Sequence, residues 1–114
     1  MEHADYAIIL GANPWAAHGI PKTRDLLKAY KKDPARTMVV IDPRLSETAK
    51  MADIHLPVKP GKDAFLLSAI IAIIIKEGLE DTAFIEKHTR NFESVKAQFL
   101  SVPIERYIDI AGLD

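Results

Sequence analysis

Two short apolar runs on either side of a helical segment constrain the fold of this chain more than any other feature. The runs cover residues 6–10 and 37–41, and each ends at turn-forming residues. Between them, residues 21–32 have the apolar spacing of an amphipathic helix. Strand, helix and strand in this order form the unit of a parallel sheet with right-handed crossovers. The sequence therefore predicts an α/β fold, and the continuous apolar strands favour a sheet covered on both faces.

The segment after the second run is expected to add a third strand to this sheet. Ser46 is a candidate cap for one helical turn over residues 47–52. Residues 54–58 predict a short strand. Pro57 within it indicates a sheet edge or an irregular segment, because proline cannot donate to a strand ladder.

The last part of the chain is predicted to be helical. Twelve mostly apolar residues follow Asp63, far fewer than the roughly 20 that a membrane span needs. They predict a buried helix over residues 64–77, with Asp63 as its N-cap. Three more helices are expected to begin near Asp81 or Thr82, at Asn91, and at Ser101 or Pro103, the last ending at Gly112.

Composition excludes several classes of function. With 114 residues the chain suits one domain, and a net charge of −1 gives no general attraction to nucleic acid. There is no cysteine, so this chain itself provides neither a disulfide nor a thiolate ligand for iron or zinc. The polar first residues do not resemble a signal peptide, and cytoplasm and periplasm of a prokaryote both remain open.

Three loops are predicted to follow the carboxyl ends of the strands, where open α/β sheets bind ligands. They cover residues 11–19, 42–46 and 60–63. Because parallel strands end at the same edge, Asp42 and Asp63 are expected to face one ligand. No GxGxxG, GxSxG or Walker A motif and no cluster of acids accompanies them. The pattern indicates a nucleotide-type binding module more than a complete catalyst.

The first loop combines close backbone approach with a polar side chain. Gly11 lets the backbone come near a ligand, Asn13 offers a donor and an acceptor, and Pro14 stiffens the residues after it. His18 is the histidine placed in this loop. Trp15 either packs onto a ligand or covers the sheet edge, and cover is favoured. A plain surface loop explains the same residues equally well.

The second loop places a carboxylate where mononucleotide-binding folds hold a ribose or a base. Asp42 can accept the paired N1–H and N2–H of guanine, and Pro43 keeps it extended. Arg44 suits a phosphate or an acidic partner. The alternative is a turn aspartate beside a solvated arginine.

The third loop and the remaining charged residues are less specific. Asp63 suits a helix cap, a ligand contact, or both. His55 alternates within an apolar segment and is interpreted as structural. A basic stripe on the first helix is interpreted as a solvated face; its members are Arg24, Lys28, Lys31 and Lys32.

Three segments carry a resemblance to a known family. They read IILGANPWAAH, VVIDPRLSETAKMADIHLPVKPGKDAFLLSAI and DTAFIEKHTRNFESVKAQFLSVPIERYIDIAGLD. Together they resemble molybdopterin oxidoreductases of the dimethyl sulfoxide reductase and formate dehydrogenase type. The family pattern is close to G-x-N-P, then D-P-R-x-T-x-T-A-x-x-A-D, then P-G-T-D before an apolar helix, and it covers nearly the whole chain.

The resemblance implies a Rossmann-like domain, residues 1–114, that binds one molybdopterin guanine dinucleotide of a bis(molybdopterin guanine dinucleotide) cofactor with Mo or W. It implies three groups of contacts: Gly11, Ala12, Asn13, Pro14 and His18 near the phosphates and the pterin side; Asp42, Pro43, Arg44 and Ser46 along the nucleotide; and Gly61, Lys62 and Asp63 at the guanine end. The sequence leaves open which aspartate takes the guanine edge.

Three residues depart from the family pattern, and they limit which residue roles the resemblance implies for this chain. Lys62 stands where Thr or Ser is usual, Ser46 replaces a common Thr, and Gly19 replaces a frequent Pro. The family's metal ligand, its iron–sulfur cluster where present, and a second dinucleotide-binding domain all lie outside the matched segments.

The resemblance therefore implies a fragment of a larger catalytic subunit that is inert alone. Its expected partners are the remaining domains of that subunit and iron–sulfur electron-transfer subunits, with no nucleic acid and no membrane span. The alternatives are a cofactor-free relative in a respiratory complex and, less in keeping with the motifs, a stand-alone nicotinamide or thiamine-type module.

Overall fold

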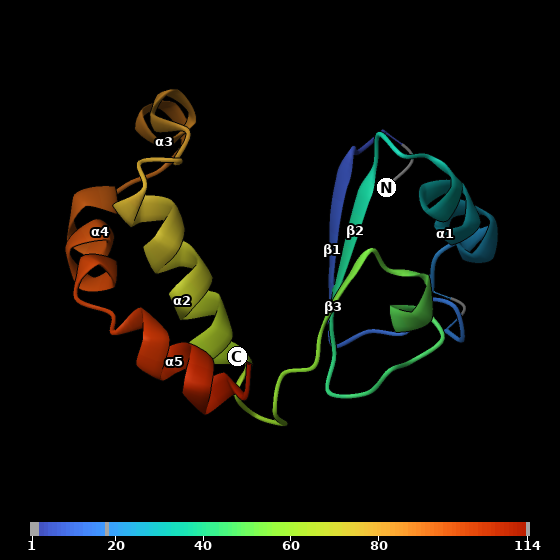
Figure 1. The fold of residues 1–114 in the computed structure, drawn as a ribbon. Coiled ribbons are helices and arrows are strands. Elements are labelled where there is room, and N and C mark those ends of the chain that lie inside the picture. The colour runs from blue at the N-terminus through green and yellow to red at the C-terminus, as the bar shows by residue number, and fades with distance from the viewer. Residues whose placement is uncertain (1–2, 18, 114) are drawn as a thin grey trace. The chain divides into compact units, whose positions relative to one another are not determined.

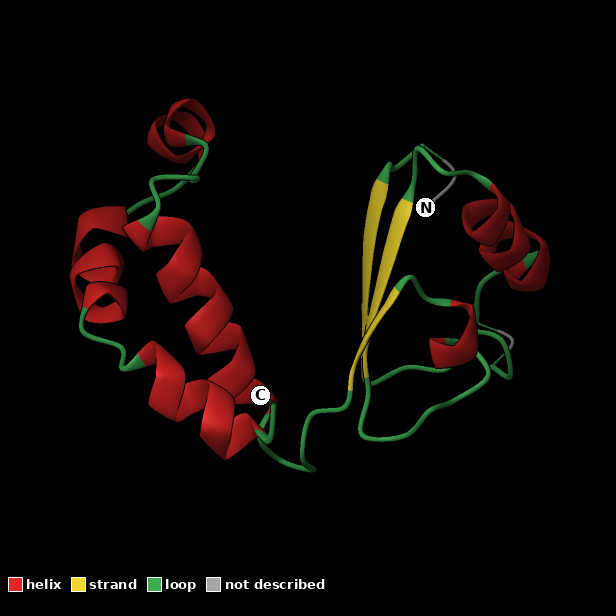
Figure 2. Ribbon diagram, viewed as in Figure 1, coloured by secondary structure: helices red, strands yellow, loops and turns green. Residues whose placement is uncertain are grey.

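The computed structural model describes residues 3–17 and 19–113 of the chain. The chain divides into two compact units, Met1–Val58 and Lys59–Asp114. All the strands of the described residues belong to the first unit, whereas the second is built from helices (Figures 1 and 2). This confirms the predicted α/β class with a helical C-terminal part.

The first unit is organised around a three-stranded parallel sheet. Its strands are β1 (Tyr6–Leu10), β2 (Thr37–Ile41) and β3 (Ile54–Leu56), in the order β1-β2-β3. Ile8, Val39 and Ile54 lie in one row across the sheet. The first two strands have the predicted bounds. The third is shorter than predicted and ends at Leu56, immediately before Pro57. Proline lacks the N–H that a further ladder bond would require.

One helix covers one face of this sheet (Figure 1). Helix α1 (Thr23–Lys32) buries Leu27 and Tyr30 against Ala7, Met38 and Val40, which form the core of the unit. On the face of the sheet opposite α1, the burial of side chains varies from strand to strand. All of β2 from Met38 to Ile41 is buried, whereas Tyr6, Ile8 and Leu10 of β1 are exposed. The expectation of a sheet covered on both faces is therefore wrong for β1, because within this unit α1 covers only one side.

Two helical segments of the first unit begin at other residues than predicted. Helix α1 begins at Thr23, not at Pro21, because Lys22 adopts a left-handed conformation with φ of 55° that interrupts the helix. The turn predicted over residues 47–52 is a shorter 3-10 helix, η1 (Ala49–Met51). The cap position of η1 is Thr48 and not Ser46 as predicted, although the Ser46 Oγ accepts a hydrogen bond from the N–H of Ala49, the first residue of η1, at 3.2 Å.

The second unit is organised around helix α2, which packs against two of the other helices. Helix α2 contacts α4 and α5 and buries Leu66, Ala69, Ala72 and Ile75, which recur at helical spacing. The rings of Phe65 and Tyr107 join α2 to α5, edge to face, at 5.0 Å. The helices are α2 (Asp63–Lys76), α3 (Thr82–His88), α4 (Phe92–Leu100) and α5 (Ile104–Ala111).

One of the predicted helix caps in this unit is confirmed and one is wrong. Asp81 caps α3 as predicted and accepts a hydrogen bond from the Phe84 N–H at 2.9 Å. The prediction that Asp63 is the N-cap of α2 is wrong: Asp63 is the first helical residue, and Lys62 occupies the cap position without a side-chain hydrogen bond. The carboxylate still lies in the first turn, where the helix dipole favours negative charge. In the described ranges, no helix combines the length and the apolar character required to cross a membrane.

The second unit closes on itself at the end of α5. The Lys59 N–H donates to the Ala111 carbonyl at 2.8 Å, so the first and last parts of the unit lie together. Gly112 ends α5 as predicted, with a φ of 80°. A Cβ built on Gly112 would lie 2.6 Å from Cε of Lys59. The left-handed backbone therefore favours glycine here, and an added Cβ would also displace the Lys59 side chain.

We expect Gly112→Ala to destabilise the second unit by about 1–3 kcal/mol, because alanine is strained at this φ and the Lys59 stem must shift. Chemical denaturation followed by circular dichroism measures the loss. Gly19→Ala is the matched control, since a Cβ added at Gly19 meets open space and its backbone has no left-handed φ. Equal stability of the two variants would contradict the preference for glycine at position 112.

Candidate functional site

The loops after β1 and β2 meet at the carboxyl edge of the sheet. Leu10 and Ile41 are partners in the parallel register, so Gly11 and Asp42 begin neighbouring loops. The Gly11 N–H donates to the Ile41 carbonyl at 2.9 Å and extends the ladder by one bond. The structure thus brings together the first two of the three predicted loops.

Asn13 connects these two loops through its side-chain amide. Its Nδ2 donates to Glu47 Oε2 at 2.7 Å, and its Oδ1 accepts from the Thr48 hydroxyl at 2.7 Å and from the Thr48 N–H at 3.3 Å. The side chain that the sequence suggested for a ligand is therefore bonded on both sides to the turn after β2. The donor and the acceptor of the Asn13 amide both form hydrogen bonds, but with other residues of the protein.

Thr48 is a site residue that the sequence reasoning did not single out. It is completely buried, and its hydroxyl also accepts a hydrogen bond from the Trp15 N–H at 3.1 Å. The family motif has a threonine at this place, D-P-R-x-T-x-T-A. That signal could have drawn attention to Thr48, although spacing alone does not reveal that its partner is the distant Asn13.

Asp42 is held by its backbone and offers part of its carboxylate. Its N–H donates to the Leu56 carbonyl at 3.2 Å, and its own carbonyl accepts from His55 Nε2 at 2.8 Å. Since a carbonyl only accepts, His55 carries its proton on Nε2 here. The interpretation of His55 as structural is confirmed.

The Asp42 side chain forms a local turn. Oδ1 accepts from the Arg44 N–H at 2.8 Å, which is the Asx-turn expected of a turn aspartate. Within the part of the chain that the structure describes, Oδ2 accepts no hydrogen bond, and the Arg44 guanidinium forms no salt bridge, although its charge acts on Glu47. One carboxylate oxygen and one cationic group are therefore available at the sheet edge.

The glycines of the first and third loops leave open space. Gly11 has a φ of 57° and Gly61 has a φ of 74°, and no heavy atom lies within 4 Å of a Cβ built on either. Each turn therefore presents bare backbone that a ligand can approach closely.

The other predicted contact residues have different environments. Ala12 and Pro43 are exposed, whereas Pro14 and Ser46 are buried, with the Ser46 hydroxyl engaged at η1. His18 lies outside the described residues. These assignments as ligand contacts stay predictions.

Lys62 and Asp63 belong to the second unit. Lys62 Nζ lies 5.6 Å from the ring centroid of Phe65, and Asp63 lies in the first turn of α2. The structure describes Asp42 and Asp63 in separate units, so the expectation that both face one ligand stays a prediction.

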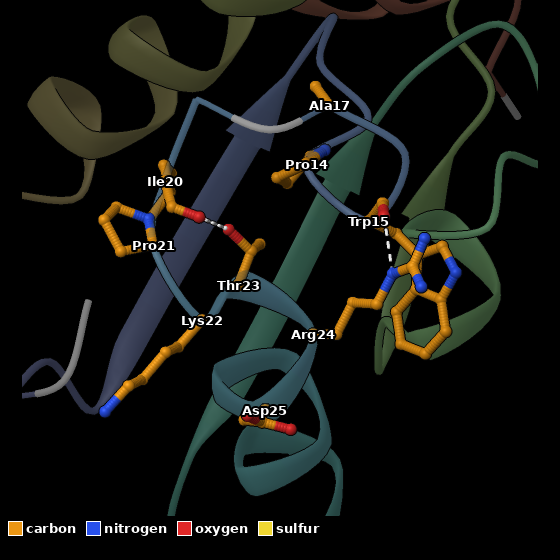
Figure 3. Close-up of a pocket in the computed structure, with 9 residues that line it drawn as sticks. All are labelled: Pro14, Trp15, Ala17, Ile20, Pro21, Lys22, Thr23, Arg24 and Asp25. Carbon is orange, nitrogen blue, oxygen red and sulfur yellow. Dashed lines mark hydrogen bonds between the residues drawn. The ribbon is translucent and has the colours of Figure 1, made fainter.

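A cavity of about 350 Å³ opens between the first loop and the start of α1, as Figure 3 shows. Arg24 donates from Nε to the Trp15 carbonyl at 3.1 Å. The Arg24 guanidinium and the Lys28 ammonium lie 5.4 and 5.9 Å from the centroid of the Trp15 ring. Trp15 itself packs against the core of the unit, which agrees with its predicted covering role. Two members of the basic stripe are therefore partners of Trp15 and not only a solvated face.

Glu47 is an ionisable group of this edge, and its pKa departs from the ordinary carboxyl value. The hydrogen bond from Asn13 lowers the pKa of the Glu47 carboxyl below its ordinary value, and Lys50 and Arg44 act in the same direction. Among the described residues, no group of three or more His, Asp or Glu side chains is arranged to hold a metal ion.

Comparison with known proteins identifies the family. The model of the molybdopterin oxidoreductase family matches residues 1–103. The chain belongs to the molybdopterin oxidoreductase family. It is 34% identical over 113 residues to an F420-dependent formate dehydrogenase alpha subunit of Methanococcus maripaludis, and 42% identical over 121 residues to a nitrate reductase of Symbiobacterium thermophilum. Each match covers 99% of this chain.

A solved structure supports the same family. The acetylene hydratase of Pelobacter acetylenicus matches with a TM-score of 0.80 and 31% identity, over 96% of this chain. This molybdopterin oxidoreductase chain spans 15% of that protein and 16% of the two curated relatives.

We expect Asn13→Ala to raise the pKa of the Glu47 carboxyl toward its ordinary value, because the variant removes the hydrogen bond that most lowers it. An NMR titration of the side-chain carboxyl carbons measures the change. Lys50→Ala serves as the control and should raise this pKa by less. A Glu47 pKa that does not respond to Asn13→Ala would contradict the hydrogen bond.

The sign of the linked stability effect follows from the lowered pKa. The native state favours ionised Glu47, so its contribution is present above the ordinary carboxyl pKa and is lost as pH falls through the lowered value. The stability difference between wild type and Asn13→Ala should therefore become smaller at acid pH, where the contribution of ionised Glu47 is lost, but it should not vanish, because the bonds from Asn13 to Thr48 do not titrate.

Proposed function

We propose that this chain binds and orients one molybdopterin guanine dinucleotide as a domain, residues 1–114, of a larger molybdenum- or tungsten-dependent oxidoreductase subunit. The observation that carries the proposal is Asp42, fixed at the carboxyl edge of the sheet with one carboxylate oxygen open beside the glycine turn of the first loop. Family membership supplies the class of cofactor, and this edge supplies groups suited to a nucleotide.

The residues at this edge fit a guanine nucleotide in their chemistry. The Asp42 carboxylate can accept from the N1–H and N2–H of guanine, since Oδ2 is open and Oδ1 retains a second lone pair. The open backbone at Gly11 admits close approach of a phosphate or sugar. The Arg44 guanidinium can pair with a phosphate.

The cofactor, when bound, supplies the redox chemistry at its metal. The residues of this chain bind and orient. Asp42 would fix the nucleotide end through paired hydrogen bonds, and His55 holds the Asp42 backbone in place. The loop from Gly11 to Pro14 would lie along the phosphates and the pterin side, with Pro14 buried as its anchor.

The turn before α2 would add contacts from the second unit. Gly61 presents open backbone, and Lys62 and Asp63 carry opposite charges at the start of the helix. In the family pattern a hydroxyl residue is usual where Lys62 stands, so Lys62 would contribute charge where a relative contributes a neutral hydrogen bond. Among the proposed cofactor contacts, those of Lys62 have the least support from the family pattern.

We propose further that the isolated chain is catalytically inert and that the metal ligand comes from other domains of the parent subunit. An iron–sulfur cluster elsewhere in that subunit and iron–sulfur partner subunits would carry the electrons. The absence of cysteine from this chain supports that division of roles.

We expect Asp42→Asn and Asp63→Asn to lower the guanine nucleotide content of the purified catalytic subunit, Asp42→Asn by roughly tenfold or more, because an amide presents a donor to guanine N–H groups and forfeits charge-assisted bonds. Acid extraction followed by chromatography measures the released guanine nucleotide.

The exposed Asp109→Asn in α5 is the matched control and should retain the wild-type content. Full nucleotide content in both site variants would overturn the assignment of the aspartates. A wild-type subunit without guanine nucleotide or metal would support the cofactor-free relative.

A further inference from the structure

We propose that Asn13 and Thr48 are a positioning pair, which locks the loop after β1 to the turn after β2 and so sets the spacing between Gly11 and Asp42. The pair acts on nucleotide binding through this spacing and not through its own contact with the nucleotide. The inference deepens the proposed function and rests on it.

The first support is the number of bonds that converge on two side chains. Asn13 bonds to Glu47 and to both the hydroxyl and the N–H of Thr48. The Thr48 hydroxyl in turn accepts from the Trp15 N–H at 3.1 Å. Four hydrogen bonds thus connect residues 13–15 with residues 47–48, far apart in the sequence.

The second support is burial. Thr48 is fully buried, so its hydroxyl has no water to replace a lost partner. A buried hydroxyl without a partner is costly, and here the hydroxyl both donates and accepts. In the observed geometry the hydroxyl is satisfied by partners on the first loop, and separation of the two loops would remove both of them.

The third support is the chemistry of the amide. Asn13 donates to a carboxylate at one end and accepts from a hydroxyl at the other. An aspartate at position 13 would keep the acceptor but place a second carboxylate against Glu47, which is ionised with a lowered pKa. The requirement is thus for an amide and not simply for a polar side chain.

The pair also changes the role expected of the first loop. With the Asn13 side chain engaged on both sides, the loop offers a ligand its backbone near Gly11, where the space is open. Asp42 lies on the adjoining loop, anchored separately by His55. The two anchors hold the two loops on which the proposed nucleotide contacts lie.

The test uses amide NMR on the 114-residue chain, with guanosine diphosphate as the probe. Asn13→Ala and Thr48→Val should each weaken guanosine diphosphate binding by roughly tenfold, and each should speed hydrogen exchange of the Trp15 amide by a similar factor. The double variant should be little worse than either single variant, because both remove the same connection.

Conservative substitutions separate positioning from general stability. Thr48→Ser keeps the hydroxyl and should restore binding close to wild type, whereas Asn13→Asp should not. Val40→Ala, a change in the buried core of the sheet, provides a variant with lower Tm and an intact pair. Measured below its Tm, it should bind guanosine diphosphate as wild type does.

The outcomes distinguish the two proposals. If wild type binds guanosine diphosphate and the pair variants bind it equally well, the positioning role is overturned while the proposed function stands. If wild type shows no binding, the proposed nucleotide contact loses its support in this chain. In that case Trp15 amide exchange that is unchanged in Asn13→Ala and Thr48→Val would still overturn the pair.

Discussion

The first unit depends on the burial of β2 from Met38 to Ile41. This strand pairs on both sides, with β1 and with β3, and Met38, Val39, Val40 and Ile41 are all removed from solvent. Its backbone groups are thus satisfied by neighbours, and its side chains supply the core on which α1 packs. Because all pairing is parallel, the chain must leave each strand at the same edge.

The proposed nucleotide contacts lie at that edge. The loops there are held in place by side chains that bind other parts of the protein. Asn13 and Thr48 hold the first loop, and His55 holds the backbone of Asp42. The groups left over are a carboxylate oxygen, a guanidinium and open glycine backbone. A cofactor-orienting domain has this division: some polar groups fix the loops, and a few others remain for the ligand.

Strands and helices could be predicted from the sequence because each depends on local pattern. The apolar runs have the same bounds as β1 and β2, and Asp81 caps α3 as its side chain and position suggest. The loops could not be predicted to the same degree. The partners of Asn13 lie more than thirty residues away, so no spacing rule reveals that its amide is engaged.

The errors at helix starts have a related cause. Lys22 enters a left-handed conformation that its residue type does not favour, and this delays α1. Residue preference alone favours Asp63 as a cap, but Lys62 holds that position and the carboxylate falls one residue inside the helix. Both errors concern which residue starts the helix, and propensity does not determine that to one position. The binding roles themselves come from the resemblance, since pattern alone leaves a plain loop as an equal interpretation.

The bond between the Lys59 N–H and the Ala111 carbonyl has a consequence for how such a subunit can vary. The segment that begins the helical unit is thereby joined directly to the end of α5. Changes of length or sequence between these two residues can be absorbed without altering the distance between Lys59 and Ala111. Gly112 is the residue whose left-handed backbone turns the chain past Lys59 at this closure.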